Sequence, residues 1–290
     1  MNINESHIVP PLAKRIRLSD YLPDIFETIP SKKGIKKAIK KKLVQLNGGV
    51  AYTGDYLTGG EVIDLLSDET YKHSTAITFD FEVLFEDEYL AIINKPAGIV
   101  VSGNQRRTIE NALTNRLTAS GALDALPMMQ AIHRLDYPTS GALLIGKTRS
   151  AVVALNKCFE QRKISKSYLA ITTANCPVDG TIAQAINEKA AVSHYKVVAT
   201  KESNKYGQLT LVQLIPETGR RHQLRIHMSD QGMPIMGDQM YSPEGEIVKG
   251  NGLFLFAHSL SFIHPITSEE LKICAPIPKK FKRFFDIDLR

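Results

Sequence analysis

A polar stretch at residues 67–77 separates two parts of the chain that differ in their pattern of apolar residues. Before it, over roughly 13–72, short apolar stretches alternate with glycine-rich turns. After it, residues 78–290 alternate strand-like runs with helical patterns. Because 290 residues suffice for two domains, the sequence predicts a small domain at 13–72 and a larger domain at 78–290.

Positive charge is concentrated near the start of the chain. Residues 1–50 contain ten Lys and Arg against four Asp and Glu, which accounts for the whole formal net charge of +6. The remaining residues therefore balance to zero. A local excess of cations predicts that this part of the protein contacts a polyanion such as RNA.

The segment after Ser31 has the pattern of an amphipathic helix. On a wheel of about 100° per residue, one side is formed by five apolar residues: Ile35, Ala38, Ile39, Leu43 and Leu46. Five lysines face the other side: Lys33, Lys36, Lys37, Lys40 and Lys41. Asn47-Gly48-Gly49 is expected to end the helix. Because the lysines lack acidic i+4 partners, we expect them to bind RNA phosphates, the alternative being a solvated lysine face.

Other elements are predicted from apolar periodicity and from capping and turn residues. Ser19 is expected to cap a short helix, and Thr148 to cap a helix that runs to about Arg162. The predicted strands lie on either side of Asp87-Glu88 and at 50–52, 61–66, 142–145, 167–172, 193–200 and 208–214.

Several classes of protein are excluded by what the sequence lacks. No run of about 18 apolar residues is present, so no membrane span is expected. Residues 1–15 lack the apolar core of a signal peptide, and the three cysteines are widely spaced, so a cytoplasmic protein with reduced thiols is expected. Motifs for nucleotide cofactors and for serine hydrolases are absent.

The histidines do not suggest a metal centre. His222 and His227 are five residues apart, which is the wrong spacing for one helical face. His258 and His264 lack nearby carboxylates. We therefore expect hydrogen-bonding roles for these side chains, with neither a metal nor a cofactor.

The first cluster that can carry chemistry comprises His133, Arg134 and Asp136, just before a turn that contains Pro138. A carboxylate held on a rigid turn beside cations stays ionised and can act as a nucleophile or a base. The alternative is a solvent-exposed polar turn without a chemical role.

The second cluster lies at residues 218–228, where the pattern permits either a strand or a short helix that ends before Gly232. If it is a helix, Arg220, Arg221 and His222 crowd its N-terminus, where the macrodipole disfavours cations. Such a cluster often marks an anion site. In that helix Arg221 and Arg225 would share one face.

Both clusters belong to an ordered series of motifs. His133-Arg134-Leu135-Asp136 with Thr139-Ser140-Gly141 resembles the signature of the RluA-type RNA pseudouridine synthases. Four further stretches resemble that family's other motifs in order: Asn94-Lys95-Pro96-Ala97-Gly98, Lys166-Ser167-Tyr168-Leu169-Ala170, Gly219-Arg220 with His222-Gln223-Leu224-Arg225, and Gly237-Asp238 with Tyr241 through Ala275-Pro276. The resemblance covers about residues 81–285.

The resemblance also extends to the first part of the chain. Ser31, Asn47-Gly48 and Gly60-Glu61 stand as in the alpha-L RNA-binding module that often precedes such enzymes. There are departures from the family pattern. Pro138 stands where an acidic residue is common, Arg221 replaces a usual Thr, and Val101-Ser102 replaces a frequent His-Pro.

The resemblance implies an α+β fold with a mixed, largely antiparallel sheet, flanking helices and a central cleft. It implies that uridine is isomerised in structured RNA, with Asp136 as the catalytic carboxylate and Arg225 holding it ionised. Tyr168 would lie beside the extracted uracil, and Arg134 would support the RNA where the base has left. The RNA-binding set would include His133, Arg134, Arg220 and Arg221.

Two other classes of function remain as alternatives. One is a catalytically silent RNA-binding or ribosome-assembly protein, and the other is a metal-dependent hydrolase. The target RNA, ribosomal or transfer, is left open, and no obligatory protein partner is implied.

Overall fold

The computed structural model describes residues 3–23, 25–26, 29, 31–66, 79–103, 106–243, 250 and 252–286. The chain forms two compact units, residues 1–75 and 76–290. The polar boundary predicted at 67–77 lies outside the described residues. The first unit starts earlier than the predicted 13–72, because the strand Ile3–Ile8 pairs with Val62–Leu66.

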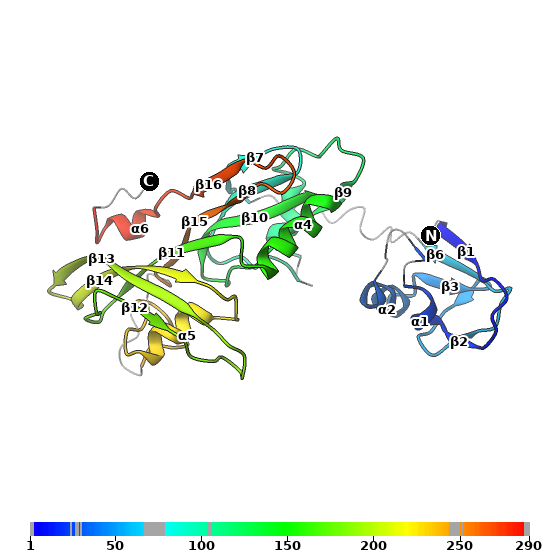
Figure 1. Ribbon diagram of the computed structural model, residues 1–290, viewed down its shortest axis with the longest axis horizontal. Helices are drawn as coiled ribbons and strands as arrows, with labels where there is room; N and C mark the ends of the chain where they lie inside the picture. The colour runs from blue at the N-terminus through cyan, green and yellow to red at the C-terminus, as the bar shows by residue number, and fades with distance from the viewer. Residues whose placement is uncertain are drawn as a thin grey trace. The chain divides into compact units, whose positions relative to one another are not determined.

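The first unit packs two helices against two small sheets (Figure 1). One sheet has the order β1-β6-β3-β4, and β2 pairs with β5 in the other. Its apolar core includes Leu18, Ile35, Val44 and Ile63, all fully buried. The elements are β1 (Ile3–Ile8), β2 (Ile16–Arg17), α1 (Leu18–Tyr21), α2 (Lys32–Lys40), β3 (Val44–Leu46), β4 (Gly49–Val50), β5 (Tyr56–Leu57) and β6 (Val62–Leu66).

Helix α2 begins where the sequence predicts but ends earlier. The Ser31 hydroxyl accepts a hydrogen bond from the Gly34 N–H at 3.1 Å, as an N-cap should. The helix stops at Lys40, so the predicted end at Asn47-Gly48-Gly49 is wrong. Instead, Asn47 and Gly48 form the turn between β3 and β4, with φ of +51° and +77°. Asn-Gly favours tight hairpin turns, and this preference prevails over the helical periodicity.

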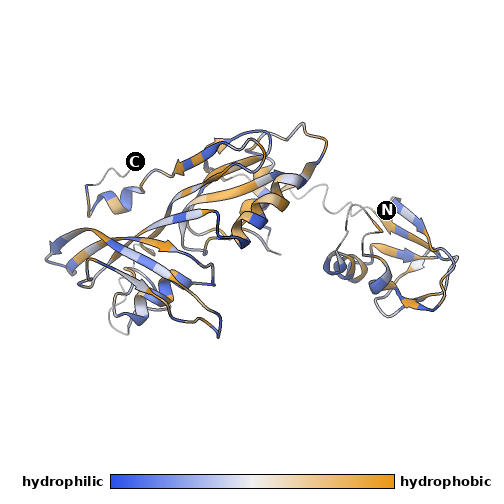
Figure 2. Cartoon of the chain, in the orientation of Figure 1, coloured by the Kyte–Doolittle hydropathy of each residue, from blue (hydrophilic) through white to orange (hydrophobic). Residues whose placement is uncertain are grey.

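The lysine-rich helix keeps its amphipathic character, and Figure 2 shows α2 largely in the hydrophilic colour. Ile35, Ala38 and Ile39 are buried, whereas its lysines are exposed. Lys41 lies at the C-cap, after the last helical residue. The prediction that Ser19 caps a helix is also wrong, because Ser19 is buried inside α1 and Arg17 occupies the N-cap position.

The second unit is built on one mixed sheet with helices packed against it, which confirms the α+β fold class. The predicted strands and the Thr148-capped helix are present. The elements are β7 (Glu82–Glu86), β8 (Leu90–Lys95), α3 (Ile109–Leu113), β9 (Ala125–Ala131), β10 (Ser140–Thr148), α4 (Arg149–Glu160), β11 (Ser165–Thr172), β12 (Asp179–Ile182), β13 (Ser193–Ser203), β14 (Gly207–Pro216), α5 (Gln223–Asp230), β15 (Leu255–Ile263), β16 (Glu270–Cys274) and α6 (Lys279–Lys282).

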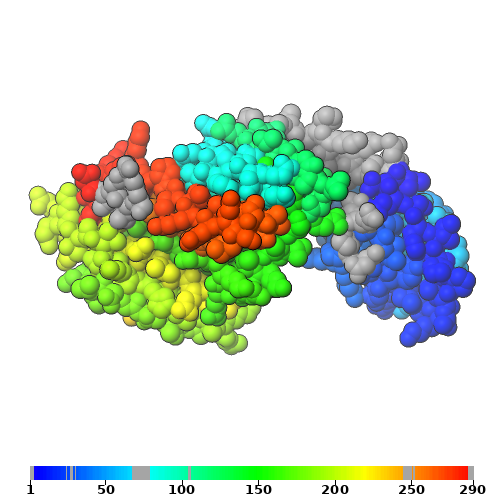
Figure 3. Space-filling model, turned by 45° about the horizontal axis from the view of Figure 1, so that its top comes forward, coloured from blue at the N-terminus to red at the C-terminus, as the bar shows by residue number. Residues whose placement is uncertain are grey.

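The sheet runs in the order β12-β13-β14-β11-β15-β10-β8-β7, with β16 beside β15 and β9 beside β10. In the space-filling view, the cyan segment that contains β7 and the orange segment that contains β16 lie side by side (Figure 3). Among the described strands, only β10 and β15 pair in parallel, and all other ladders are antiparallel. The sheet is therefore two antiparallel halves joined at one parallel ladder.

Apolar residues on β8 and β10 alternate between the two faces of this sheet. Ile92 and Leu144 belong to one buried cluster, and their neighbours Ile93 and Leu143 belong to another. This alternation is the period-two pattern of a strand covered on both sides. Leu155 of α4 packs into the first cluster, and α3 packs into the second. This half of the sheet is therefore covered by a helix on each face.

The parallel ladder depends on Gly141. It pairs with Ala257 of β15 on one side and with Lys95 of β8 on the other. Its φ is +119°, a conformation that residues with a side chain rarely adopt. A Cβ at this position would lie 2.1 Å from the Ala257 carbonyl oxygen. Only glycine therefore lets β10 approach β15 this closely.

We predict that Gly141→Ala lowers the free energy of unfolding by about 2–5 kcal/mol, because strain at positive φ adds to a clash with backbone. Urea unfolding measures the change. The matched control is Gly207→Ala, with φ of +69° but no described heavy atom within 4 Å of an added Cβ. The control should lose about 1 kcal/mol from strain alone. Equal losses in the two variants would contradict the close-approach argument.

Candidate active site

Asp136 lies on a turn between β9 and β10 that is fixed by backbone contacts. The Thr139 N–H donates to the Asp136 carbonyl at 3.0 Å, and the Gly98 N–H donates to the Tyr137 carbonyl at 2.8 Å. The Lys95 ammonium donates to the Thr139 carbonyl at 2.8 Å. The motif that contains Lys95 and Gly98 therefore holds the turn of Asp136 through hydrogen bonds to two of its backbone carbonyls.

Lys95 is fully buried, so its charge is unusual. Its ammonium also donates to the Pro96 carbonyl at 2.8 Å. Burial lowers the pKa of Lys95 to about 8, and the negative charge of Asp136 opposes this shift. Lys95 therefore places a buried ammonium against the turn that carries Asp136.

Arg225, on α5, contacts two carboxylates. Its Nε and Nη2 donate to Asp238 at 2.7 and 2.8 Å, which is a bidentate pair. Its Nη1 lies 3.4 Å from Asp136 Oδ2. Arg225 and Asp238 are both buried. The predicted contact between Arg225 and Asp136 is present, but Asp238 is the tighter partner.

Asp238 is held ionised by its surroundings. Burial opposes ionisation, but hydrogen bonds from Arg225 and from the backbone N–H groups of Met240 and Tyr241 outweigh it, so the pKa of Asp238 is lowered. The carboxylate in turn fixes the guanidinium of Arg225 in one orientation. Asp238 therefore acts on Asp136 through Arg225.

His222 approaches Asp136 from the other side. Its Nε2 lies 3.7 Å from Asp136 Oδ1, and its Nδ1 is 2.8 Å from the Tyr241 hydroxyl. The residue has a φ of +57° and precedes the first turn of α5. Burial lowers the pKa of His222, and the charges of Arg225 and Arg221 lower it further against the opposing effect of Asp136.

Tyr168 comes from β11, near the centre of the sheet. It pairs with Leu214 of β14 and Ala257 of β15, and the register of the β11–β15 ladder shifts between Ser167 and Tyr168. Such an irregularity re-aims a side chain. Burial raises the pKa of Tyr168, and the charge of Asp136 raises it further. The phenol therefore stays protonated and does not serve as a base at neutral pH.

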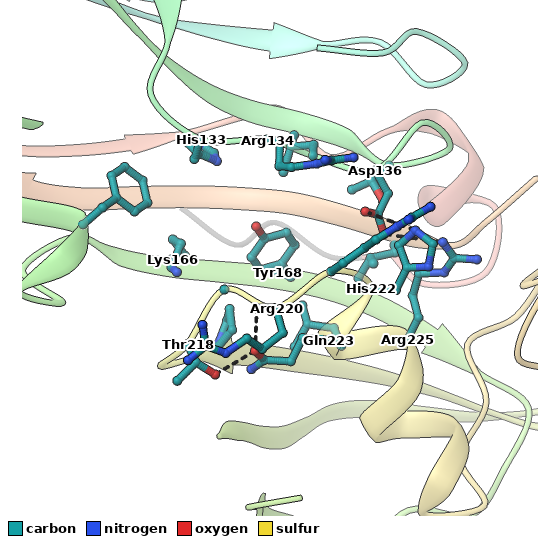
Figure 4. Close-up of a pocket in the computed structure, with 18 residues that line it drawn as sticks. His133, Arg134, Asp136, Lys166, Tyr168, Thr218, Arg220, His222, Gln223 and Arg225 are labelled. Carbon is teal, nitrogen blue, oxygen red and sulfur yellow. Dashed lines mark hydrogen bonds and ion pairs between the residues drawn. The ribbon is translucent and has the colours of Figure 1, made fainter. Parts of the chain in front are cut away.

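These side chains share one cavity of about 320 Å³ (Figure 4). Tyr168 lies between Lys166 and Asp136 in this view, and His222 and Arg225 lie near the carboxylate. The loop before α5 is held by Gln223, which accepts from the Thr218 hydroxyl at 2.7 Å and the Arg220 N–H at 3.0 Å. The cavity is lined by His133, Arg134, Leu135, Asp136, Thr139, Phe159, Lys166, Tyr168, Pro216, Thr218, Gly219, Arg220, Arg221, His222, Gln223, Leu224, Arg225 and Leu255.

The cations predicted to bind RNA do not all have the same surroundings. Arg134 is exposed at the cavity. The Arg220 Nε donates to the Ala190 carbonyl at 3.1 Å, which orients the rest of the guanidinium. Arg221 is exposed and precedes α5, so the expectation that it shares a helical face with Arg225 is wrong. The loop before α5 takes the place of the predicted first helical turn.

His133 is placed to support the fold. Its Nε2 accepts a hydrogen bond from the Leu144 N–H at 3.1 Å, and its ring packs on Phe159 with centroids 5.1 Å apart. Burial, with a smaller contribution from the Lys166 charge, lowers the pKa of His133 to about 3. A neutral imidazole engaged with backbone is a poor phosphate ligand, although it lines the cavity.

No three His, Cys, Asp or Glu side chains gather as metal ligands anywhere in the part of the chain that the structure describes. None of the described helices is long and apolar enough to cross a membrane. One expectation about the histidines is wrong, because His264 does have a nearby carboxylate. Its Nε2 lies 2.9 Å from Asp87 Oδ2, which is far from it in sequence.

Comparison with known proteins assigns this geometry to a family. Residues 89–230 match the sequence model of the family described as RNA pseudouridylate synthase. The Ribosomal large subunit pseudouridine synthase D of Xanthomonas campestris is 30% identical, over 95% of this chain and 90% of the relative. That of Buchnera aphidicola is 32% identical, over 92% of each chain. The chain belongs to the RluA-type RNA pseudouridine synthases.

The fold comparison agrees with this assignment. The solved structure of Human RNA Pseudouridylate Synthase Domain Containing 1 has a TM-score of 0.58 and 24% identity. It covers 69% of this chain and 84% of that chain. The synthase therefore shares its sheet architecture with solved members of the same fold. Enzymes of this family isomerise uridine in RNA.

The sequence analysis assigned roles to Asp136, Arg225 and Tyr168, and the structure places all three in the same cavity. Two residues that support the site were not predicted from the sequence. Asp238 stands in a family-like motif, yet no role was assigned to it, because its pairing with Arg225 spans a loop. Lys95 was also recognised only as part of a motif. The signal for both was an ionisable residue inside an otherwise apolar or glycine-containing stretch.

We predict that Asp238→Asn lowers the free energy of unfolding by about 3–5 kcal/mol at pH 7, because it leaves a buried arginine without its carboxylate. Since the folded-state pKa of Asp238 is lowered, its stabilisation is present above the unfolded-state pKa near 4 and is lost as pH falls below it. Urea unfolding from pH 7 to pH 3 should show the two proteins converging in acid.

The control for this prediction is Asp230→Asn, an exposed carboxylate at the end of α5. It should change the unfolding free energy by less than about 0.5 kcal/mol. A constant difference between wild type and Asp238→Asn across this pH range would mean that the ionised pair is not the source of stability.

Proposed function

We propose that this synthase isomerises uridines in large-subunit ribosomal RNA and that Asp136 is its catalytic carboxylate. The observation that carries the proposal is a carboxylate at the wall of a cavity, met by two neighbours at long range, 3.4 Å from Arg225 and 3.7 Å from His222. Its oxygens are oriented but not fully engaged. They remain available to a substrate that enters beside Tyr168.

The reaction exchanges one bond of ribose for another. The bond from C1′ to N1 of uracil breaks, the base turns, and C1′ is joined to C5, whose hydrogen leaves to solvent while N1 gains one. Asp136 adds covalently or drives departure of the base and then removal of the proton. Arg225 orients the carboxylate, and the protonated Tyr168 packs beside the uracil.

The choice of ribosomal RNA rests on the relatives. Two proteins named Ribosomal large subunit pseudouridine synthase D align over at least 90% of their own length with this chain. A stacked uridine must leave its stack before it can enter this cavity, at a cost of a few kcal/mol. Arg134, Arg220 and Arg221 are exposed residues of the cavity lining and are suited to hold the displaced strand.

We also propose that the first unit is an alpha-L-type RNA-binding module. Four exposed lysines of α2, Lys33, Lys36, Lys37 and Lys40, form a cationic stripe opposite its buried face, and Lys41 follows at the C-cap. Lys32 differs from them because it pairs with Asp20 at 2.7 Å. Phosphates of structured RNA would relieve the repulsion within the stripe.

We predict that RNA labelled with tritium at C5 of uracil releases label to water when incubated with this protein. Asp136→Asn should reduce the release by at least about a thousandfold, because an amide is neither a nucleophile nor a base at neutral pH. The variant should keep most of its RNA affinity, since phosphate contacts supply it. Its affinity is measured alongside by equilibrium binding.

The substrate should be ribosomal RNA from cells that lack this protein, so that its target is unmodified. Mapping pseudouridine before and after incubation identifies the site. If the wild type releases no label from ribosomal or transfer RNA, the catalytically silent RNA-binding protein becomes the better description. If Asp136→Asn stays active, the enzyme stands but the catalytic assignment is wrong.

We predict that replacing Lys36, Lys37 and Lys40 by Gln weakens RNA binding and flattens its salt dependence. The slope of log K against log salt should fall by about 0.7–0.9 for each phosphate that the variant no longer neutralises. The matched control replaces three exposed lysines of the second unit by Gln: Lys196, Lys201 and Lys272. If both triple variants lower the slope equally, net charge alone explains the effect and the stripe is a solvated face.

A further inference from the structure

Lys166 is a cation of the cavity that takes no part in holding Asp136. It lies on β11 two residues before Tyr168. Both side chains line the same cavity. Figure 4 shows Lys166 on the side of Tyr168 away from Asp136. Its ammonium is therefore aimed into the site without being a neighbour of the catalytic carboxylate.

The charge of Lys166 has no anionic partner among the residues that the structure describes. No carboxylate of those residues forms an ion pair with it, and its ammonium faces the Phe159 ring, whose centroid is 5.6 Å from Nζ. The side chain is half-buried, and burial lowers the pKa of Lys166. An uncompensated cation in such a place costs stability, so an anion that arrives there is bound favourably.

The other end of the cavity is different. The guanidinium of Arg225 is matched by Asp238 and Asp136, so its charge is already satisfied by the protein. Next to Lys166, the imidazole that lines the wall is His133, which is neutral and held by backbone. Arg134, Arg220 and Arg221 also line the cavity. Arg225 is thus matched by carboxylates, whereas Lys166, on the other side of Tyr168 from Asp136, is not.

An RNA nucleotide has the complementary chemistry. Uracil is neutral and planar, which suits the space between Tyr168 and Asp136, while the phosphodiester is the nearest anion that is covalently attached to the same ribose. We propose that Lys166 binds a backbone phosphate that flanks the target uridine. This contact holds the flipped nucleotide in register while the base turns. The inference rests on the proposed function of the Asp136 site.

The test compares three variants in the tritium-release assay on the same ribosomal RNA. Lys166→Met keeps the length of the side chain but removes its charge, and Lys166→Arg keeps the charge. The control is Lys163→Met, an exposed lysine just before β11 that does not line the cavity. Thermal unfolding of each variant checks that the fold is kept.

We expect Lys166→Met to raise KM about tenfold or more, because the variant cannot form the charge-assisted hydrogen bond to the phosphate. The slope of log KM against log salt should fall by about 0.7–0.9, the value for one phosphate. Lys166→Arg should recover most of both quantities, and Lys163→Met should change neither. If Lys166→Met lowers kcat with an unchanged salt slope, the ammonium acts on the base or on a ribose hydroxyl, and the proposal is overturned.

A modified substrate locates the phosphate once the target uridine is mapped. Short RNAs carry one uncharged methylphosphonate linkage, either 5′ or 3′ of that uridine. One of the two should impair the wild type by about tenfold yet impair Lys166→Met no further, since coupled partners are non-additive. Additive losses at both linkages would overturn the proposal. A wild type that turns over no RNA would instead refute the proposed function itself.

Discussion

The geometry of the second unit depends on the parallel ladder between β10 and β15. It joins two antiparallel halves of the sheet through only two described pairs, Ser140 with Phe256 and Gly141 with Ala257. The turn that carries Asp136 ends where this ladder begins, and Tyr168 pairs with Ala257 from the opposite side of β15. Asp136, the proposed catalytic carboxylate, and Tyr168 therefore come from different halves of the sheet and meet because Gly141 permits the two strands to approach.

The buried charges show how a carboxylate can be oriented without being neutralised. Asp238 takes the fork of Arg225 at 2.7 and 2.8 Å, whereas Asp136 meets the same guanidinium at 3.4 Å. A bidentate pair with Asp136 itself would occupy the oxygens that, in the proposed mechanism, act on the substrate. Asp238 forms the bidentate pair with Arg225 instead. Lys95 holds the turn itself through the Thr139 carbonyl at 2.8 Å, so neither cation forms a tight bond with Asp136.

Sequence was sufficient where the determining interactions are local. Thr148 caps α4 and Ser31 caps α2, and β8 and β10 could be recognised as short apolar runs, as expected for strands that are covered on both faces. The end of α2 was missed because two local preferences compete over 41–49: the wheel favours helix, but Asn47-Gly48 favours a hairpin that the pairing with β6 stabilises. That pairing is not readable from the segment itself.

The residues of the site could likewise be predicted where the signal is local, but their mutual contacts could not. Asp136, Tyr168 and Arg225 stand in motifs whose order along the chain points to one family, so the family resemblance located them. Their distances depend on contacts between segments about 30 to 90 residues apart, such as the one between Arg225 and Asp136. The partnership of Arg225 with Asp238 and the unmatched charge of Lys166 arise only when β11, α5 and the loop after it are brought together. The burial of Arg225 and Asp238, which makes their pairing important for stability, is likewise a property of the fold.

The tyrosine and the two histidines of the cavity are held uncharged, and this fits the chemistry. Burial raises the pKa of Tyr168 and lowers those of His133 and His222, so all three favour their neutral forms near pH 7. Isomerisation of uridine releases one proton from C5 and places one on N1, so the substrate changes neither its net charge nor its redox state. A site for such a reaction needs no group that ends the cycle in a new ionisation state. It needs one carboxylate, fixed cations to orient it and its RNA, and neutral walls around the turning base.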